Sequence, residues 1–190
     1  MNSAARRSRT PLVLALAFSI LAVGSVASAA EYWSPKSVLK SFFATSKKVG
    51  PRTITLPDAT ADAIAKKVGV PSIKKTWTIY FAEGEEGRRD GYAILDVEKG
   101  MHEPIDYAVH FSSGGAVERV EIMVYREAYG DEVRGERFRK QFKGKTAKDA
   151  IIAGKDIDIV SGASISSRSV AIGVKRDALV LQHAISSGSL

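Results

Sequence analysis

The spacing of apolar positions changes along the chain, and each spacing predicts a different kind of element. Before residue 70, apolar side chains recur three and four positions apart, as in Leu39, Phe42 and Phe43. This is the spacing of one face of a helix. Ser34 followed by proline is typical of a helix start. We therefore predict a helical lead-in over residues 30–70, made of two short helices and a short extended piece.

From Thr76 onward the apolar period shortens to two, which is the period of a half-buried strand. Turn-forming sequences separate the alternating segments, among them the charged stretch EGEEGRRDG and the tight turn SSGG. Successive strands joined by short turns favour an antiparallel meander. The four predicted strands are Thr76–Ala82, Tyr92–Glu98, Ile105–Phe111 and Val117–Tyr125.

Helical spacing returns after the predicted sheet. Phe138 and Phe142 lie four positions apart in a short amphipathic segment, and an apolar stripe then continues from about residue 166 to residue 185. No internal repeat or low-complexity linker interrupts the chain. We therefore predict a single α+β domain, with its main part over residues 71–190 and an antiparallel sheet that has helices before and after it.

The first 29 residues have the pattern of an export signal. Arg6, Arg7 and Arg9 precede the apolar run 11–26, and the small residues Ala27-Ser28-Ala29 follow it. The run is shorter than the roughly 20 apolar residues that cross a membrane as a helix. We predict a cleaved signal peptide over residues 1–29, a periplasmic mature protein and no membrane span in that mature protein. An uncleaved anchor is the alternative.

Composition narrows the range of sites. The 190 residues include no cysteine, which excludes disulfides, thiolate metal sites and thioether-attached haem. The formal charge is +7, and the three arginines of the signal leave +4 for the mature chain. Although the net charge is positive, we expect no nucleic-acid partner, because an exported protein meets little nucleic acid. The charge suits either attraction to acidic partners or anionic membrane, or a solvated surface without a partner.

The stretch DIVSGASISSRS, residues 158–169, is the strongest candidate for chemistry. Serine and glycine before an apolar helix are good capping residues, so a helix cap explains the composition on its own. The unsatisfied amides at a helix start also make a seat for a phosphate, and a glycine such as Gly162 lets a phosphate approach the backbone. A serine hydroxyl there could hold the phosphate as an ester.

The segment DIVSGAS resembles the flavinylation motif of the FMN-binding domain family, Asp-x-x-Ser-Gly-Ala-Thr/Ser. The family includes flavin subunits of sodium-pumping quinone reductases and of ferredoxin-linked Rnf-type complexes, and many periplasmic domains. The resemblance extends over about residues 80–180, through the predicted sheet, the loop YREAYGDEV and the segment RFRKQFKGK. The chain departs from the common motif in carrying serine where threonine is more frequent.

The resemblance implies FMN joined by a phosphoester to Ser164, after a flavin transferase cleaves FAD. It assigns Asp158, Ser161, Gly162 and Ala163 to the motif, with Asp158 serving either the transferase or nearby amides. Ser161, Ser166 and Ser167 are expected either to bond the phosphate, or to be solvated or cap the backbone. A second candidate set, in the loop after the last strand, would lie against the flavin ring: Glu127, Tyr129 and Gly130.

The resemblance implies an exported electron-transfer flavoprotein, more an electron carrier than a catalyst. Its partners would be the flavin transferase and a redox protein, either a membrane quinol or flavin-handling complex or periplasmic cytochromes. One alternative is an FMN-dependent reductase of a small substrate, although no substrate domain is visible at this length. Another is a non-redox binding module with an empty flavin site. We expect no metal, since the three histidines lack the spacing of metal ligands.

Overall fold

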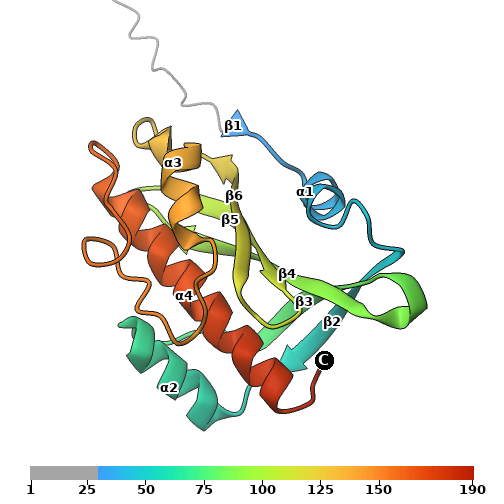
Figure 1. Ribbon diagram of the computed structural model, residues 1–190. Coiled ribbons are helices and arrows are strands. Elements are labelled where there is room, and N and C mark those ends of the chain that lie inside the picture. Colours follow the sequence, from blue (N-terminus) through green and yellow to red (C-terminus); the bar gives the residue numbers. More distant parts are fainter. Residues whose placement is uncertain (1–29) are drawn as a thin grey trace, which may run out of the picture.

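The computed structural model describes residues 30–190, so the predicted signal peptide lies outside the described residues. One antiparallel sheet forms the centre of the domain, with strand order β1-β6-β5-β4-β3-β2 (Figure 1). The strands are β1 Ala30–Glu31, β2 Lys48–Thr55, β3 Thr76–Glu83, β4 Arg89–Lys99, β5 Pro104–Ser112 and β6 Val117–Tyr125. The predicted α+β class and the meander are confirmed, since β3 to β6 pair in sequence order.

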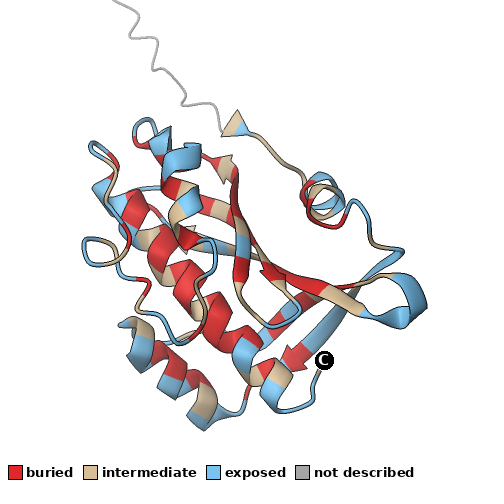
Figure 2. Cartoon of the chain, in the orientation of Figure 1, coloured by how far each residue is buried: buried red, intermediate tan, exposed pale blue. Residues whose placement is uncertain are grey.

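The two faces of the sheet are covered by different helices. The helices are α1 Pro35–Phe42, α2 Asp58–Val68, α3 Glu136–Arg139 and α4 Ser164–Ser186, with short 3₁₀ turns η1 Glu85–Gly87, η2 Asp131–Arg134 and η3 Lys140–Phe142. Helices α2, α3 and α4 contribute to the larger apolar core, whereas α1 covers the opposite face. Figure 2 shows a stripe of buried residues along α4, whose inner side packs on the sheet. No helix within residues 30–190 is long and apolar enough to cross a membrane.

The lead-in differs from the helical segment that we predicted for residues 30–70. Lys48–Thr55 is an eight-residue strand that pairs with β3, so this part of the lead-in belongs to the sheet. Pro51 is tolerated because β2 is an edge strand, where the missing amide breaks no ladder bond. A Cβ at Gly50 would lie 3.1 Å from the Phe81 ring, so a larger residue there would require the ring to shift by a few tenths of an ångström.

The start of α1 confirms the prediction from Ser34 and proline. The Ser34 side chain accepts a hydrogen bond from the Ser37 amide, and the Ser37 hydroxyl accepts one from the Ser34 amide. This reciprocal pair is a capping box, which satisfies amides that the first helical turn leaves free. The capped helix then buries Val38 and Phe42 against the sheet.

Candidate cofactor site

Helix α4 begins at Ser164, two residues earlier than the apolar stripe predicted, and its first turn has no side-chain cap. The N-cap residue is Ala163, which has no side-chain acceptor, and the first turn contains no acidic residue. Within residues 30–190 the amides of Ser164, Ile165 and Ser166 have no hydrogen-bond acceptor. The positive end of a 23-residue helix is therefore open to an anion.

The turn before α4 is held from inside the protein by Ser167. Its buried hydroxyl donates to the Ala163 carbonyl at 2.8 Å and accepts from the Val160 amide at 3.2 Å. Gly162 has φ of +80°, and a Cβ at this position would meet no atom within 4 Å. Ser167 thus stabilises the turn, the second of the two roles expected for it, while Gly162 leaves open space beside the start of the helix.

Ser166 is also used inside the protein. Tyr125 of β6 donates its hydroxyl proton to the Tyr129 carbonyl at 2.7 Å, and the hydroxyls of Tyr125 and Ser166 lie 2.8 Å apart. A phenol has one proton, so Ser166 is the donor to Tyr125. Both Ser166 and Tyr125 are buried. The proton of Ser166 is therefore committed to the fold, and Tyr125 is a supporting residue that the sequence analysis did not identify.

Gly130 lets this hydrogen-bonded group form. Its φ is +90°, and a Cβ there would lie 2.6 Å from the Tyr125 hydroxyl and 3.4 Å from Ser166 Oγ. The sequence analysis expected Gly130 to bring the loop close to a flavin ring. In the structure the close approach at Gly130 is to Tyr125, so the glycine positions the loop after β6 against the start of α4.

Glu127 fixes the neighbouring loop by accepting hydrogen bonds from backbone amides. Its Oε1 accepts from the amides of His102 and Glu103 at 2.7 and 3.1 Å. Partial burial alone would raise the pKa of the Glu127 carboxyl, but these amide donors outweigh burial and lower that pKa. The carboxylate therefore stays charged and ties the loop before β5 to the loop after β6.

A cavity of about 510 Å³ lies between these two loops and the start of α4. Ser164 lines it with an exposed side chain. Tyr129 and Met101 also line it and are 86% and 59% exposed, which is unusual for such large apolar groups. The cavity is lined by Met101, His102, Glu127, Ala128, Tyr129, Gly162, Ala163, Ser164, Ile165 and Ser166. Its volume is in the range of small-molecule sites, about 300–1,000 Å³.

Two residues of the motif lie elsewhere. Asp158 and Ser161 line a separate cavity of about 420 Å³ that faces α3 and η2. The Asp158 amide donates to Gln141 Oε1 at 2.6 Å, which ties this segment to η3. The structure therefore brings Gly162, Ala163, Ser164, Glu127 and Tyr129 around one cavity and places Asp158 and Ser161 on another. An Asp158 that serves a maturation partner, one of its two expected roles, is compatible with this placement.

Met101, His102, Ala128 and Ile165 line the Ser164 cavity, although the sequence analysis did not include them in the site. His102 lies at an exposed position in the loop before β5. Its place at the cavity comes from the contact between Glu127 and the loop before β5. No sequence pattern indicated that contact, because 25 residues separate the two positions.

Comparison with known proteins bears on the part of the chain that forms the Ser164 cavity. Residues 100–178 match the family described as FMN-binding domain. The matched residues include both sides of the Ser164 cavity, and the resemblance inferred from the motif is confirmed over these residues. The crystal structure of NqrC from Shewanella oneidensis matches with a TM-score of 0.50 at 19% identity, over 72% of this chain and 80% of that chain. This second match shows a shared fold. No curated protein matches the chain.

Proposed function

We propose that this protein is an exported electron-transfer flavoprotein that carries FMN as a phosphoester on Ser164. One observation carries the proposal: Ser164 is an exposed hydroxyl at the uncapped start of α4 and lines a cavity large enough for a cofactor. The matching FMN-binding domain supplies the identity of the cofactor.

The residues around the cavity fit a phosphate-linked flavin. A phosphodiester on Ser164 keeps one negative charge, and the free amides of the first turn of α4 would stabilise that charge. The open space beside Gly162 leaves room for the phosphate. The exposed side chains of Met101, Tyr129 and Ile165 offer apolar and aromatic surface to the ring.

Attachment would proceed by group transfer from FAD. The Ser164 oxygen forms a bond to the phosphorus of the FMN half, the pyrophosphate bond breaks, AMP leaves, and the hydroxyl proton is lost. Bound FMN would accept and pass on electrons one or two at a time. The chain itself contributes the anchor, the hydrogen bonds that hold the two loops, and an exposed approach to the cavity.

Export and partners complete the proposal. The signal-like first 29 residues would direct the protein to the periplasm, where released FMN could not readily be replaced and a covalent link has a clear advantage. A flavin transferase would load Ser164. A membrane redox complex or a periplasmic cytochrome would exchange electrons with the domain.

The test is intact mass and peptide mapping of protein purified from its native periplasm. We expect a gain of one FMN minus one water, on a peptide that contains Ser164. Ser164→Ala should abolish the gain and Ser164→Thr should keep it, whereas Ser113→Ala serves as the control because this exposed serine lies in the turn between β5 and β6, outside the motif and the cavity. Equal yellow colour in denatured wild type and Ser164→Ala protein would refute the assignment. Unmodified wild type from a host that flavinylates other proteins would favour the binding-module alternative.

A further inference from the structure

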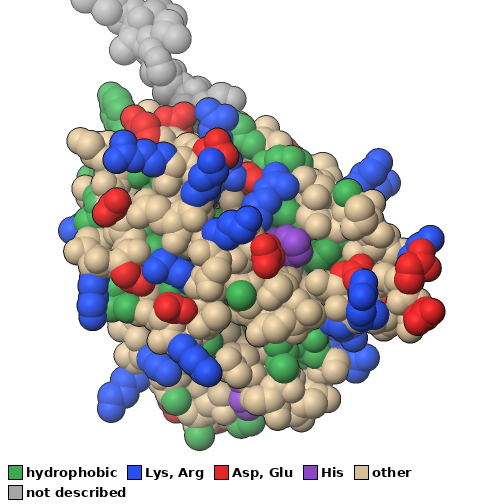
Figure 3. Space-filling model, viewed as in Figure 1, with side chains coloured by type: hydrophobic (Ala, Val, Ile, Leu, Met, Phe, Trp, Pro, Cys, Tyr) green, Lys and Arg blue, Asp and Glu red, His purple; other side chains and the backbone are tan. Residues whose placement is uncertain are grey.

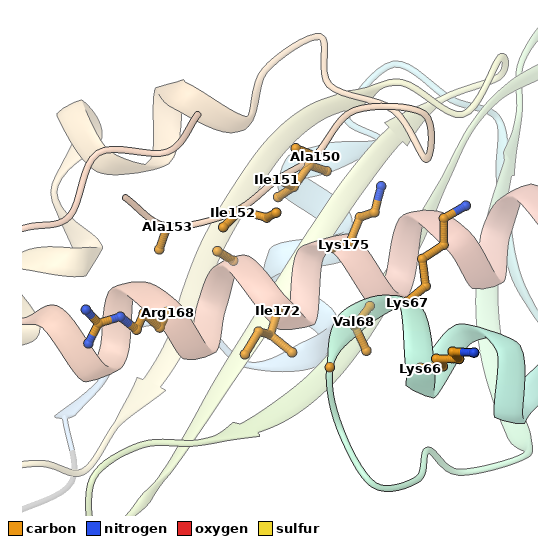
Figure 4. Close-up of a pocket in the computed structure, with 12 residues that line it drawn as sticks. Lys66, Lys67, Val68, Ala150, Ile151, Ile152, Ala153, Arg168, Ile172 and Lys175 are labelled. Carbon is orange, nitrogen blue, oxygen red and sulfur yellow. The ribbon is translucent and has the colours of Figure 1, made fainter. Parts of the chain in front are cut away.

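A second pocket, of about 430 Å³, lies on the flank of α4 and shares no lining residue with the Ser164 cavity (Figure 4). The end of α2, the segment 150–153 and the outer side of α4 surround it. Figure 4 shows Arg168 toward one end of the pocket, Lys66, Lys67 and Lys175 toward the other, and Ile172 between them. Its lining residues are Lys66, Lys67, Val68, Gly69, Ala150, Ile151, Ile152, Ala153, Arg168, Ala171, Ile172 and Lys175.

The pocket is strongly cationic. Four of its lining residues are basic and none is acidic. Within residues 30–190, Lys66, Lys67, Arg168 and Lys175 form no ion pair, although many other basic side chains of the domain do. The space-filling view also shows basic side chains over α2 (Figure 3). The carboxylates of Asp149 and Asp156 act on Lys175 from behind the pocket wall. The exposed cations at the rim have no such partner within residues 30–190, so they are complementary to an anion.

Lys175 places one cation deep in the pocket wall. It is 7% exposed, and its Nζ donates to the carbonyls of Ala147, at 2.9 Å, and Asp149. An ammonium group has three donors, so one remains for a ligand. Lys66, Lys67 and Arg168 are exposed at the rim. Arg168 and Lys175 are seven residues apart on α4, which corresponds to about 10 Å along the helix.

Apolar surface faces the same pocket. Ile151 is buried at φ of +50°, a strained conformation for a β-branched residue, while its neighbour Ile152 is 50% exposed. Asp156 holds this arrangement by accepting from the amides of Ile151 and Ile152 at 3.0 and 2.7 Å. The backbone is thus held in a conformation that leaves an isoleucine side chain exposed beside a ring of cations.

We propose that this pocket binds the phosphate headgroup of an anionic phospholipid and seats the domain on a membrane surface. A free phosphate would contact the basic side chains but leave the exposed Ile152 and the other apolar lining of the pocket in water. A phospholipid matches both, because its phosphate meets the lysines while Ile152 enters the interface between headgroups and chains. Arg168 is one turn of α4 beyond Ser164, about 6 Å along the axis, so the seated domain holds its cofactor site close to the membrane.

The test is sedimentation of the exported protein with vesicles of phosphatidylglycerol and phosphatidylcholine, compared with vesicles of phosphatidylcholine alone. We expect binding to the anionic vesicles only, falling as salt is raised. Each basic residue near an anionic surface contributes about fivefold to binding, so Lys66→Gln with Lys67→Gln should weaken it about twenty-five-fold. Ile152→Ser should weaken it about fivefold.

The matched control is Lys36→Gln with Lys40→Gln, which removes the same charge from exposed positions on α1, on the other face of the sheet. It should leave binding within about twofold. The proposal would be overturned if the control variant lost as much vesicle binding as the Lys66 and Lys67 variant, or if wild type bound neutral vesicles equally well. It would also be overturned if inorganic phosphate, rather than short-chain phosphatidylglycerol, fully displaced the protein from the vesicles. Ser164→Ala protein should bind vesicles as wild type does, so failure of the lipid site and failure of flavin attachment are distinguishable.

Discussion

The hydroxyl of Ser166 lies 2.8 Å from the hydroxyl of Tyr125, and this buried contact joins the first turn of α4 to the end of β6. Because the Tyr125 hydroxyl also donates a hydrogen bond to the Tyr129 carbonyl, three segments of the site depend on this one side chain. These are the end of the sheet, the loop after it and the helix that carries Ser164. Burial raises the pKa of Tyr125, a rise that the hydrogen bond with Ser166 partly offsets, so the phenol keeps its proton at neutral pH.

Tyr125→Phe should lower the free energy of unfolding by about 1–3 kcal/mol, because it leaves the Ser166 hydroxyl and the Tyr129 carbonyl without partners. Urea denaturation measures the change. Tyr80→Phe is the control, since the Tyr80 hydroxyl forms no hydrogen bond within residues 30–190 and the ring is partly buried in the second core. Equal destabilisation of the two variants would show that the hydrogen bonds at Tyr125 add nothing.

Gly130→Ala should be more damaging than the same change at Gly69. Both glycines have positive φ, +90° and +77°, so alanine is strained at each. Only at Gly130 does the new Cβ meet an atom, the Tyr125 hydroxyl at 2.6 Å, because the position at Gly69 is open. We expect a loss of about 1 kcal/mol for Gly69→Ala and at least about twice that for Gly130→Ala. Thermal denaturation of both variants measures the loss of stability. Equal losses for Gly130→Ala and Gly69→Ala would contradict the prediction.

The sequence was a good guide to the strands and a poorer guide to the site. Alternation of apolar residues located β3 to β6 within a few residues, because each of these strands has one face on the core. It indicated only the last residues of β2, as the short extended piece from Thr53, because Gly50 and Pro51 resemble a break and only the edge position makes them acceptable.

Local sequence patterns could not indicate which groups the serine hydroxyls at the site would bond. The motif pointed to Ser164, and the structure places that residue in a cavity. The roles of Ser166 and Ser167 depend on Tyr125 and on a turn of the backbone, and the former contact spans 41 residues. A hydroxyl in a serine-rich stretch is equally suited to a ligand or to the fold until its neighbours are known.

His110 should make stability fall as the solution is acidified below neutral pH. Burial and the nearby Arg119 lower its pKa from 6.5 to about 4, and its ring stacks on Phe42 with centroids 5.1 Å apart. Between these two pKa values the unfolded chain binds a proton that the folded protein does not, so stability decreases as pH falls through this window.

We expect a loss of about 2 kcal/mol from His110 between pH 7.5 and pH 4, discounted because the ring is partly exposed. His110→Gln should remove this component of the pH dependence. His102→Gln, at an exposed position, should retain it. Urea denaturation of wild type and both variants at the two pH values measures the component, and parallel acid dependence in wild type and His110→Gln would contradict the assignment.

Asp177 should destabilise the protein at neutral pH. It is fully buried in α4, and both of its carboxylate oxygens lack hydrogen-bond partners within residues 30–190. Burial raises its pKa well above 3.8 and repulsion from Asp96 adds to the rise, which outweighs the attraction of Arg176, whose Nε lies 3.8 Å from Asp177 Oδ1. Above pH 3.8 the unfolded chain releases this proton while the folded protein retains it, so the contribution of Asp177 to stability is greatest below pH 3.8 and is lost as pH rises toward the folded pKa.

Asp177→Asn should therefore stabilise the protein at pH 7, by about 1 kcal/mol or more, because a neutral amide can be buried without first taking up a proton. The gain should shrink toward zero near pH 3, below the unfolded pKa of 3.8, where the carboxyl is largely protonated in both states. Asp62→Asn on the exposed face of α2 is the control and should change stability by less than about 0.5 kcal/mol. Denaturation at both pH values tests the sign: a variant less stable than wild type at pH 7 would mean that the buried Asp177 carboxylate is charged and paired in the folded protein.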